Sequence, residues 1–150
     1  MAVSRRQARD WAIQMLTAAD MNPPDDTGAF CDYFWAELSD ITKAEASEAK
    51  KAEMRAFAEE RVKGVLANLA EIDAILVPML QNWDMYRLGT VERAVIRMGV
   101  WELKYSDVPP PVVINEAVDL ANWFSAPKSR TIVNGVLDRF AKTLAAKKPQ

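Results

Sequence analysis

Apolar residues recur at intervals of three and four along most of the chain, which is the spacing of one face of an α-helix. The first stripe follows Ser4, a residue type that caps helix starts, and comprises Ala8, Trp11, Ala12, Met15, Leu16 and Ala19. Asn22-Pro23-Pro24 should end this helix near Met21 because proline restricts the backbone and lacks an N–H donor. A second helix is expected after Asp25 and Asp26, with apolar positions at Phe30, Tyr33, Phe34, Ala36 and Leu38.

The stretch from Ala44 to Trp83 has helical character throughout but is long for one helix of a globular protein. Asn68 and Glu71 resemble a capping pair, so we expect a break near residues 68–70. Pro78 predicts a kink or an irregular end in the second part.

The last third of the chain predicts three more helices. Thr90 should cap the first, whose apolar residues surround the cylinder and indicate a central position. Pro109-Pro110-Pro111 can start the next helix, which extends to Phe124, and Ser125 should cap the last. Because no stretch alternates as a strand would, the pattern predicts an all-α domain of about seven helices over residues 1–150.

The residue types present exclude several kinds of chemistry. The chain has no histidine, which removes His-based catalytic triads, general bases and metal sites. Its single cysteine, Cys31, lies among apolar and aromatic residues and is expected to be a packing residue. No apolar run is long enough for a membrane span, and the first residues lack the features of a secretory signal. We therefore expect a cytoplasmic protein without enzymatic activity, cofactor or metal.

Charge is unevenly distributed along the chain. Residues 20–60 carry eleven acidic side chains against four basic ones, and the role of this acidic segment is left open. Arg5, Arg6 and Arg9 form a basic cluster at the start of the first helix, where guanidinium groups can bind phosphates or stack on unpaired bases. The alternative is an ordinary solvated helix face.

Polar residues of the later helices have structural and functional interpretations. Glu102 falls near an apolar stripe and is expected to be a partly buried structural carboxylate rather than a catalytic acid. Asn134 and Gly135 should belong to a close contact between helices. A separate group at the turn before the last helix places a basic pair beside an aromatic ring, which is typical of contacts with single-stranded RNA, and consists of Phe124, Lys128 and Arg130.

The chain resembles the NusB family of transcription antitermination factors. The similarity is carried in order by RRQAR, LGTVERAVIRMGVWEL, DVPPPVVINEAVDLANWF and SRTIVNGVLD, and it spans nearly the whole chain, with residues 20–60 the least constrained. INEAVDLA followed by VNGVLD at this separation is the most specific part of the similarity.

The resemblance implies two packed helical subdomains, with approximate halves 1–83 and 84–150. It implies binding to the boxA element of ribosomal RNA transcripts together with a small-subunit ribosomal protein, NusE, within the RNA polymerase antitermination complex. By the same resemblance, Arg5, Arg6, Arg9, Phe124, Lys128 and Arg130 are RNA-binding candidates. The candidates for binding the ribosomal protein are Arg87, Glu92 and Arg93.

Two positions depart from the family pattern. Thr17 stands where members often have an aromatic residue, which predicts the loss of one stacking contact with RNA, and Ile132 stands where phenylalanine is common. Two alternative functions therefore stay open, a helical protein-binding module and an accessory subunit in ribosomal RNA modification. Monomer and homodimer also stay open, as do the RNA affinity and the exact RNA sequence preference.

Overall fold

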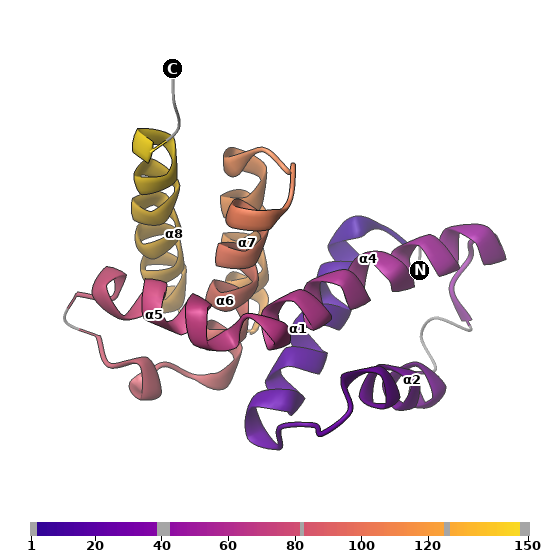
Figure 1. Ribbon diagram of the computed structural model, residues 1–150. Coiled ribbons are helices and arrows are strands. Elements are labelled where there is room, and N and C mark those ends of the chain that lie inside the picture. The colour runs from indigo at the N-terminus through magenta and orange to yellow at the C-terminus, as the bar shows by residue number, and fades with distance from the viewer. Residues whose placement is uncertain (1–2, 39–42, 82, 125–126, 148–150) are drawn as a thin grey trace.

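A computed structural model describes residues 3–38, 43–81, 83–124 and 127–147 (Figure 1), except for the side chain of Phe124. Within these ranges the chain forms seven α-helices and one 3-10 turn, and no strand. The elements are α1 Arg5–Met21, α2 Thr27–Glu37, α4 Glu48–Ala67, α5 Leu69–Met79, η1 Met85–Arg87, α6 Thr90–Tyr105, α7 Pro110–Phe124 and α8 Pro127–Lys147. The prediction of an all-α fold of about seven helices is confirmed.

Side chains with short polar groups set the helix starts. The Ser4 hydroxyl accepts a hydrogen bond from the Gln7 amide at 3.2 Å, as expected for the start of α1. Asp26 caps α2 in the same way. The Ser47 hydroxyl accepts from the Lys50 amide at 3.1 Å, so α4 begins later than the predicted Ala44.

The long helical stretch is broken at Asn68, as predicted, but by a different contact. The Asn68 side-chain amide donates to the carbonyl oxygen of Gly64 at 2.7 Å, which satisfies the end of α4. It makes no side-chain cap for α5, so the expected capping pair was wrong. Pro78 lies one residue before the end of α5, and its missing N–H removes one hydrogen bond, to the Ala74 carbonyl, from the last turn of the helix.

Helix α6 is the centre of the fold. Every residue from Ala94 to Glu102 is buried, because α1, α4, α5, α7 and α8 all pack against it. Gly89 is its N-cap, so the predicted cap at Thr90 was wrong by one residue, whereas the predicted central position is confirmed. The predicted cap at Ser125 lies outside the described residues. The division into halves at residue 83 stays a prediction.

Glycine permits close helix contacts at positions that the sequence pattern did not indicate. A Cβ atom at Gly64 would overlap the Trp101 indole, and one at Gly99 would lie 2.7 Å from a Leu137 methyl group. The expected close contact at Gly135 was wrong, because a Cβ there would meet only the end of the Arg139 side chain of its own helix. Asn134 is exposed.

Candidate nucleic-acid interface

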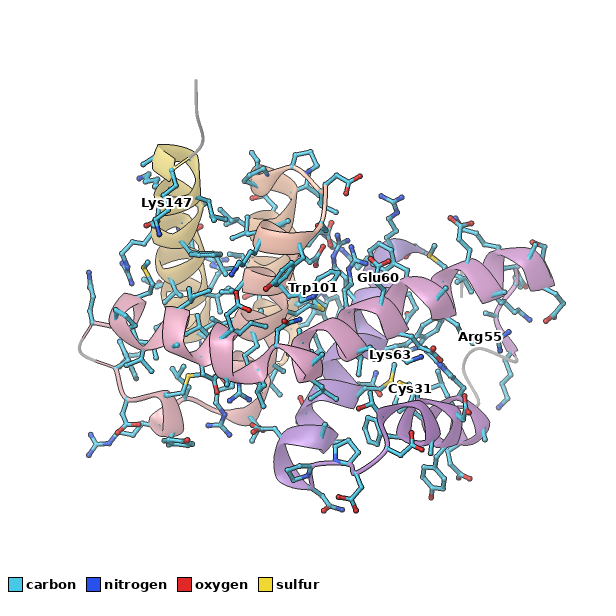
Figure 2. The ribbon with its side chains drawn as sticks, in the orientation of Figure 1. Cys31, Arg55, Glu60, Lys63, Trp101 and Lys147 are labelled. Atoms are coloured by element: carbon cyan, nitrogen blue, oxygen red, sulfur yellow. The ribbon has the colours of Figure 1, made fainter. Side chains whose placement is uncertain are left out.

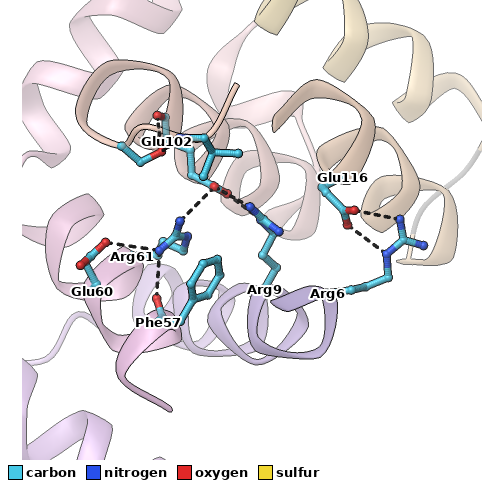
Figure 3. A network of polar contacts seen from close by, with 9 residues as sticks. Arg6, Arg9, Phe57, Glu60, Arg61, Glu102 and Glu116 are labelled. Carbon is cyan, nitrogen blue, oxygen red and sulfur yellow. Dashed lines mark hydrogen bonds and ion pairs between the residues drawn. The ribbon is translucent and has the colours of Figure 1, made fainter. Parts of the chain in front are cut away.

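The three N-terminal arginines have three different environments. Arg9 is only 3% exposed, and its guanidinium makes two 2.9 Å hydrogen bonds to the two carboxylate oxygens of Glu102. Arg61 of α4 donates to the same carboxylate at 3.2 Å (Figure 3). Glu102 is therefore a structural carboxylate, as the sequence predicted, but it is fully rather than partly buried. Arg9 joins α1 to α6, and it is not part of an open basic face.

Two buried arginines share the single Glu102 carboxylate, so this buried cluster holds two positive charges and one negative charge. Burial lowers the pKa of Arg61 below its ordinary value, although the charge and hydrogen bond of Glu102 act in the opposite direction. The Arg61 guanidinium also lies 3.4 Å from the centroid of the Phe57 ring, and its Nε has no hydrogen-bond partner in the described part of the chain. The sequence pattern did not single out Arg61, because its carboxylate partner is 41 residues away.

Arg6 is half exposed and pairs with two carboxylates of α7. Its Nε donates to Glu116 at 2.9 Å (Figure 3), and its Nη2 donates to Asp119 at 2.7 Å. The hydrogen bond to Glu116 is the main cause that raises the pKa of Arg6. An RNA phosphate that binds Arg6 has to compete with these two carboxylates. Glu116 therefore joins α7 to α1.

Of the three arginines, Arg5 is the most accessible to a phosphate group. Its side chain is exposed, and it makes no ion pair with any carboxylate of the described residues. Its guanidinium lies 5.5 Å from the centroid of the Phe57 ring, so an aromatic face supports it.

A groove of about 800 Å³ opens beside these arginines. It lies between the start of α1, the Phe57–Arg61 turn of α4 and the connection from α6 to α7. Its walls combine guanidinium groups, aromatic rings and carboxylates, and they include Arg5, Arg6, Arg9, Phe57, Glu60, Arg61, Trp101, Tyr105, Asp107, Val112 and Glu116. The sequence pattern indicated neither Phe57 nor Tyr105 as a site residue.

The second predicted RNA contact lies at the turn between α7 and α8. Lys128 and Arg130 are exposed, but the Phe124 side chain lies outside the described residues. Trp123 is 80% exposed and adds an aromatic ring that the sequence interpretation missed. Asp119 and Trp123 are four residues apart and share a face of α7, about 6 Å along the axis. The Asp119 contact of Arg6 is thus one helical turn from this exposed tryptophan.

The predicted partner-binding residues differ in availability. Arg87 is exposed on η1, beside Tyr86, which is also exposed. Glu92 accepts a 2.6 Å hydrogen bond from the Ser129 hydroxyl and thereby joins the starts of α6 and α8. The Arg93 side chain is only 11% exposed, and it donates to Asp20 at 2.9 Å and to the Leu88 carbonyl at 2.9 Å.

Asp20 links the end of α1 to both Arg93 and Arg97 of α6. Burial alone would raise the pKa of Asp20, but the hydrogen bonds and charges of the two arginines outweigh it and hold the pKa below its ordinary value. A contact between Arg93 and the ribosomal protein therefore has to form while the Arg93 guanidinium is bonded to Asp20.

Thr17 borders an apolar hollow of about 310 Å³ between α1 and the first turn of α6. Its hydroxyl is buried and has no hydrogen-bond partner among the described residues. The other walls include Ile13, Met21 and Val91. The loss of a stacking contact with RNA at this position stays a prediction.

Cys31 is fully buried on α2, in the space between α2 and α4 (Figure 2), which confirms its packing role. Burial, and then the negative charge of Glu59, raise the pKa of the Cys31 thiol to about 11. Since the thiolate is the reactive form, we expect native protein at pH 8 to react with a thiol reagent at least about a hundredfold more slowly than protein unfolded in urea. A colorimetric thiol assay measures both rates. Equal rates would contradict this burial.

Two kinds of feature are absent from the described residues. No group of His, Cys, Asp and Glu among them has the arrangement of a metal site. None of the described helices is both long and apolar enough to span a membrane.

Comparison with known proteins gives the family. The profile of the NusB family matches residues 6–142. The chain belongs to the NusB family. Similar curated members include the transcription antitermination protein NusB of a Nitratiruptor species, which is 38% identical over 93% of this chain and 92% of its own. NusB of Listeria monocytogenes serotype 4b is 37% identical over 93% of this chain and 97% of its own.

The fold agrees with solved structures of the NusB family. One is the crystal structure of antitermination factors NusB and NusE in complex with double-stranded RNA. The matching chain of that structure is 28% identical, with a TM-score of 0.76, over 93% of this chain and 96% of that chain. The resemblance that the sequence motifs indicated is confirmed.

Proposed function

We propose that this chain is a transcription antitermination factor that binds boxA RNA of ribosomal RNA transcripts together with the ribosomal protein NusE. The observation that carries the proposal is the similarity to curated NusB transcription antitermination proteins over 93% of the chain. A solved relative with the same fold is in complex with NusE and double-stranded RNA. On this proposal the protein acts by binding, without a catalytic step, in the cytoplasm beside RNA polymerase.

The RNA-binding residues that we propose fall into direct and supporting groups. Arg5 and Arg6 bind phosphates at one end of the interface, and Lys128 and Arg130 bind them at the α7–α8 turn. Phe124 and the exposed Trp123 offer rings for base stacking at that turn. Arg9 has a supporting role, because its bidentate contact with Glu102 occupies its guanidinium while it holds α1 in place.

We place the ribosomal protein on the surface around η1 and the start of α6. Arg87 is the candidate for direct contact there, because its side chain is exposed. Glu92 and Arg93 shape the same surface through their bonds to Ser129 and Asp20. This arrangement leaves the arginines of α1 to the RNA.

A binding titration with boxA RNA in the presence of the ribosomal protein tests the proposal. Replacing Arg5 and Arg6 together by alanine should weaken binding about tenfold, because two phosphate contacts are lost. The dependence of the logarithm of affinity on the logarithm of salt concentration should become shallower by about 0.7 for each lost contact with single-stranded RNA. Fluorescence anisotropy at several salt concentrations measures both effects.

The control is Lys63→Ala, which removes one positive charge, half of that lost in the double variant, from the α2 side of α4, where Lys63 pairs with Glu59 (Figure 2). This variant should bind RNA like the unchanged protein. Equal affinity for boxA and scrambled RNA would contradict specific recognition. Recovery of the ribosomal protein without RNA would favour the alternative, a protein-binding module, for which the carboxylates on Arg6 and the hollow at Thr17 are the supporting observations.

A further inference from the structure

The groove between α1, α4 and the α6–α7 connection has features that phosphate binding by the α1 arginines does not require. Tyr105 lies in its wall and is 44% exposed, and Val112, also in the wall, is 43% exposed. The volume of about 800 Å³ lies within the range of small-ligand sites, which is about 300–1,000 Å³. The groove therefore has room for a planar group beside the exposed part of the Tyr105 ring, and the Lys104 ammonium lies 5.3 Å from the centroid of that ring.

The Tyr105 ring is held in position before any ligand arrives. Its hydroxyl donates to Glu71 of α5 at 2.8 Å, and its ring centroid lies 6.1 Å from that of Trp101. The next residue, Ser106, donates from its hydroxyl to the Glu102 carbonyl at 2.7 Å and so fixes the end of α6. A ring fixed in this way can stack on a base at a small cost in conformational entropy.

The charges of the groove select among occupants. Arg5 is exposed and makes no ion pair within the described residues, so it can bind one phosphate. Glu60 and Glu116 also line the groove, where they pair with Arg61 and Arg6, and Asp107 adds a further negative charge. The groove therefore lacks the concentrated positive charge that a compact polyanion with several phosphates needs. Carboxylates do accept hydrogen bonds from the amino groups of bases. A nucleic-acid strand that presents one phosphate beside one unpaired base fits this combination.

We propose that this groove, the Tyr105 groove, binds a single unpaired nucleotide of the RNA, with its base stacked on Tyr105 and its phosphate on Arg5. The proposal rests on the RNA-binding function above and adds a site for one nucleotide beyond the α7–α8 turn. It assigns to the connection after α6 a part in RNA binding, and it makes Phe57 the support of the phosphate-binding arginine through the 5.5 Å contact between them.

The test compares Tyr105→Ala and Tyr105→Phe in the boxA RNA titration with the ribosomal protein present. Phenylalanine keeps the stacking ring and should bind within about twofold of the unchanged protein, whereas alanine should bind about tenfold more weakly. Tyr33→Ala is the matched control, since Tyr33 is an exposed tyrosine of α2 that does not line the groove. Circular dichroism and urea unfolding of each variant establish that all of them are folded.

The loss of the Tyr105 hydroxyl bond is controlled separately. Glu71→Gln weakens the hydrogen bond of the Tyr105 hydroxyl and removes the ion pair between Glu71 and Lys104, but it keeps the ring and its contact with Trp101. It should therefore bind RNA within about twofold of the unchanged protein, as Tyr105→Phe does. If Glu71→Gln weakened RNA binding as much as Tyr105→Ala, the effect would come from helix packing and the stacking proposal would be overturned.

The outcomes separate this proposal from the proposed function. If the unchanged protein binds boxA RNA and the Arg5 and Arg6 double variant is weakened, but Tyr105→Ala is not, the Tyr105 groove proposal is overturned and the function stands. If Tyr105→Ala loses the ribosomal protein rather than RNA, the groove is a protein-binding site and the proposal is again overturned. If the unchanged protein binds no boxA RNA, both are overturned.

Discussion

Replacing Glu102 by alanine is expected to lower the free energy of unfolding by about 3–5 kcal/mol, because it leaves two buried arginines without their carboxylate. Arg9 and Arg61 are 3% and 2% exposed, and both donate to Glu102. Both side chains border the groove beside α1 but expose so little surface that water replaces the lost carboxylate only in part. Equilibrium unfolding in urea, followed by circular dichroism, measures the change.

The control for this prediction is Glu60→Ala. Glu60 also pairs with Arg61, at 3.4 Å, but its side chain is 64% exposed, so its loss should cost less than about 1 kcal/mol. Glu102→Gln should fall between the two, since the amide keeps one acceptor oxygen but loses the charge. A Glu102→Ala protein as stable as Glu60→Ala would show that the buried cluster does not hold the helices together.

Replacing Gly64 by alanine is expected to destabilise the protein by about 2–3 kcal/mol, because the new methyl group overlaps the Trp101 indole. Trp101 is a core residue of α6 that contacts Arg61 and Tyr105, so moving its indole away from Gly64 disturbs those contacts. The gain in helix propensity from glycine to alanine, about 1 kcal/mol, is too small to offset the overlap. Thermal and urea unfolding measure the difference.

Gly135→Ala provides the comparison for Gly64→Ala. A Cβ at Gly135 would lie 3.3 Å from the end of the Arg139 side chain, which can move, so the stability should stay within about 1 kcal/mol of the unchanged protein. If Gly64→Ala were as stable as Gly135→Ala, the close contact between α4 and α6 would be more accommodating than the geometry indicates.

The N-terminal arginine cluster has a dual role in this protein. Arg9 shares the Glu102 carboxylate with Arg61 inside the fold, and Arg6 pairs with two carboxylates at the surface. Arg5 makes no ion pair in the described part of the chain. A local count of basic residues therefore overstates the positive charge available to RNA. The adjacent aromatic residues, Phe57 and Tyr105, supply surface that such a count does not include.

The sequence alone predicted the helices well, because a helix depends on neighbouring residues. The apolar spacing from Ala8 to Ala19 and the polar group of Ser4 are local features, and both appear in α1 as expected. The break at Asn68 was also placed correctly, although its hydrogen bond goes to the end of α4. The family motifs indicated the family for the same reason, since they are short patterns of neighbouring residues.

The sequence by itself thus determined the helical class, most helix boundaries, the family and the set of basic residues near the ends of the interface. Only the tertiary structure decided which of those residues are available. Arg9 meets Glu102 across 93 residues and Arg6 meets Asp119 across 113, and no local spacing encodes such partners. The packing of α1 and α4 on α6 buries Arg9 and leaves Arg5 exposed. It also brings Phe57 and Tyr105 to the same groove.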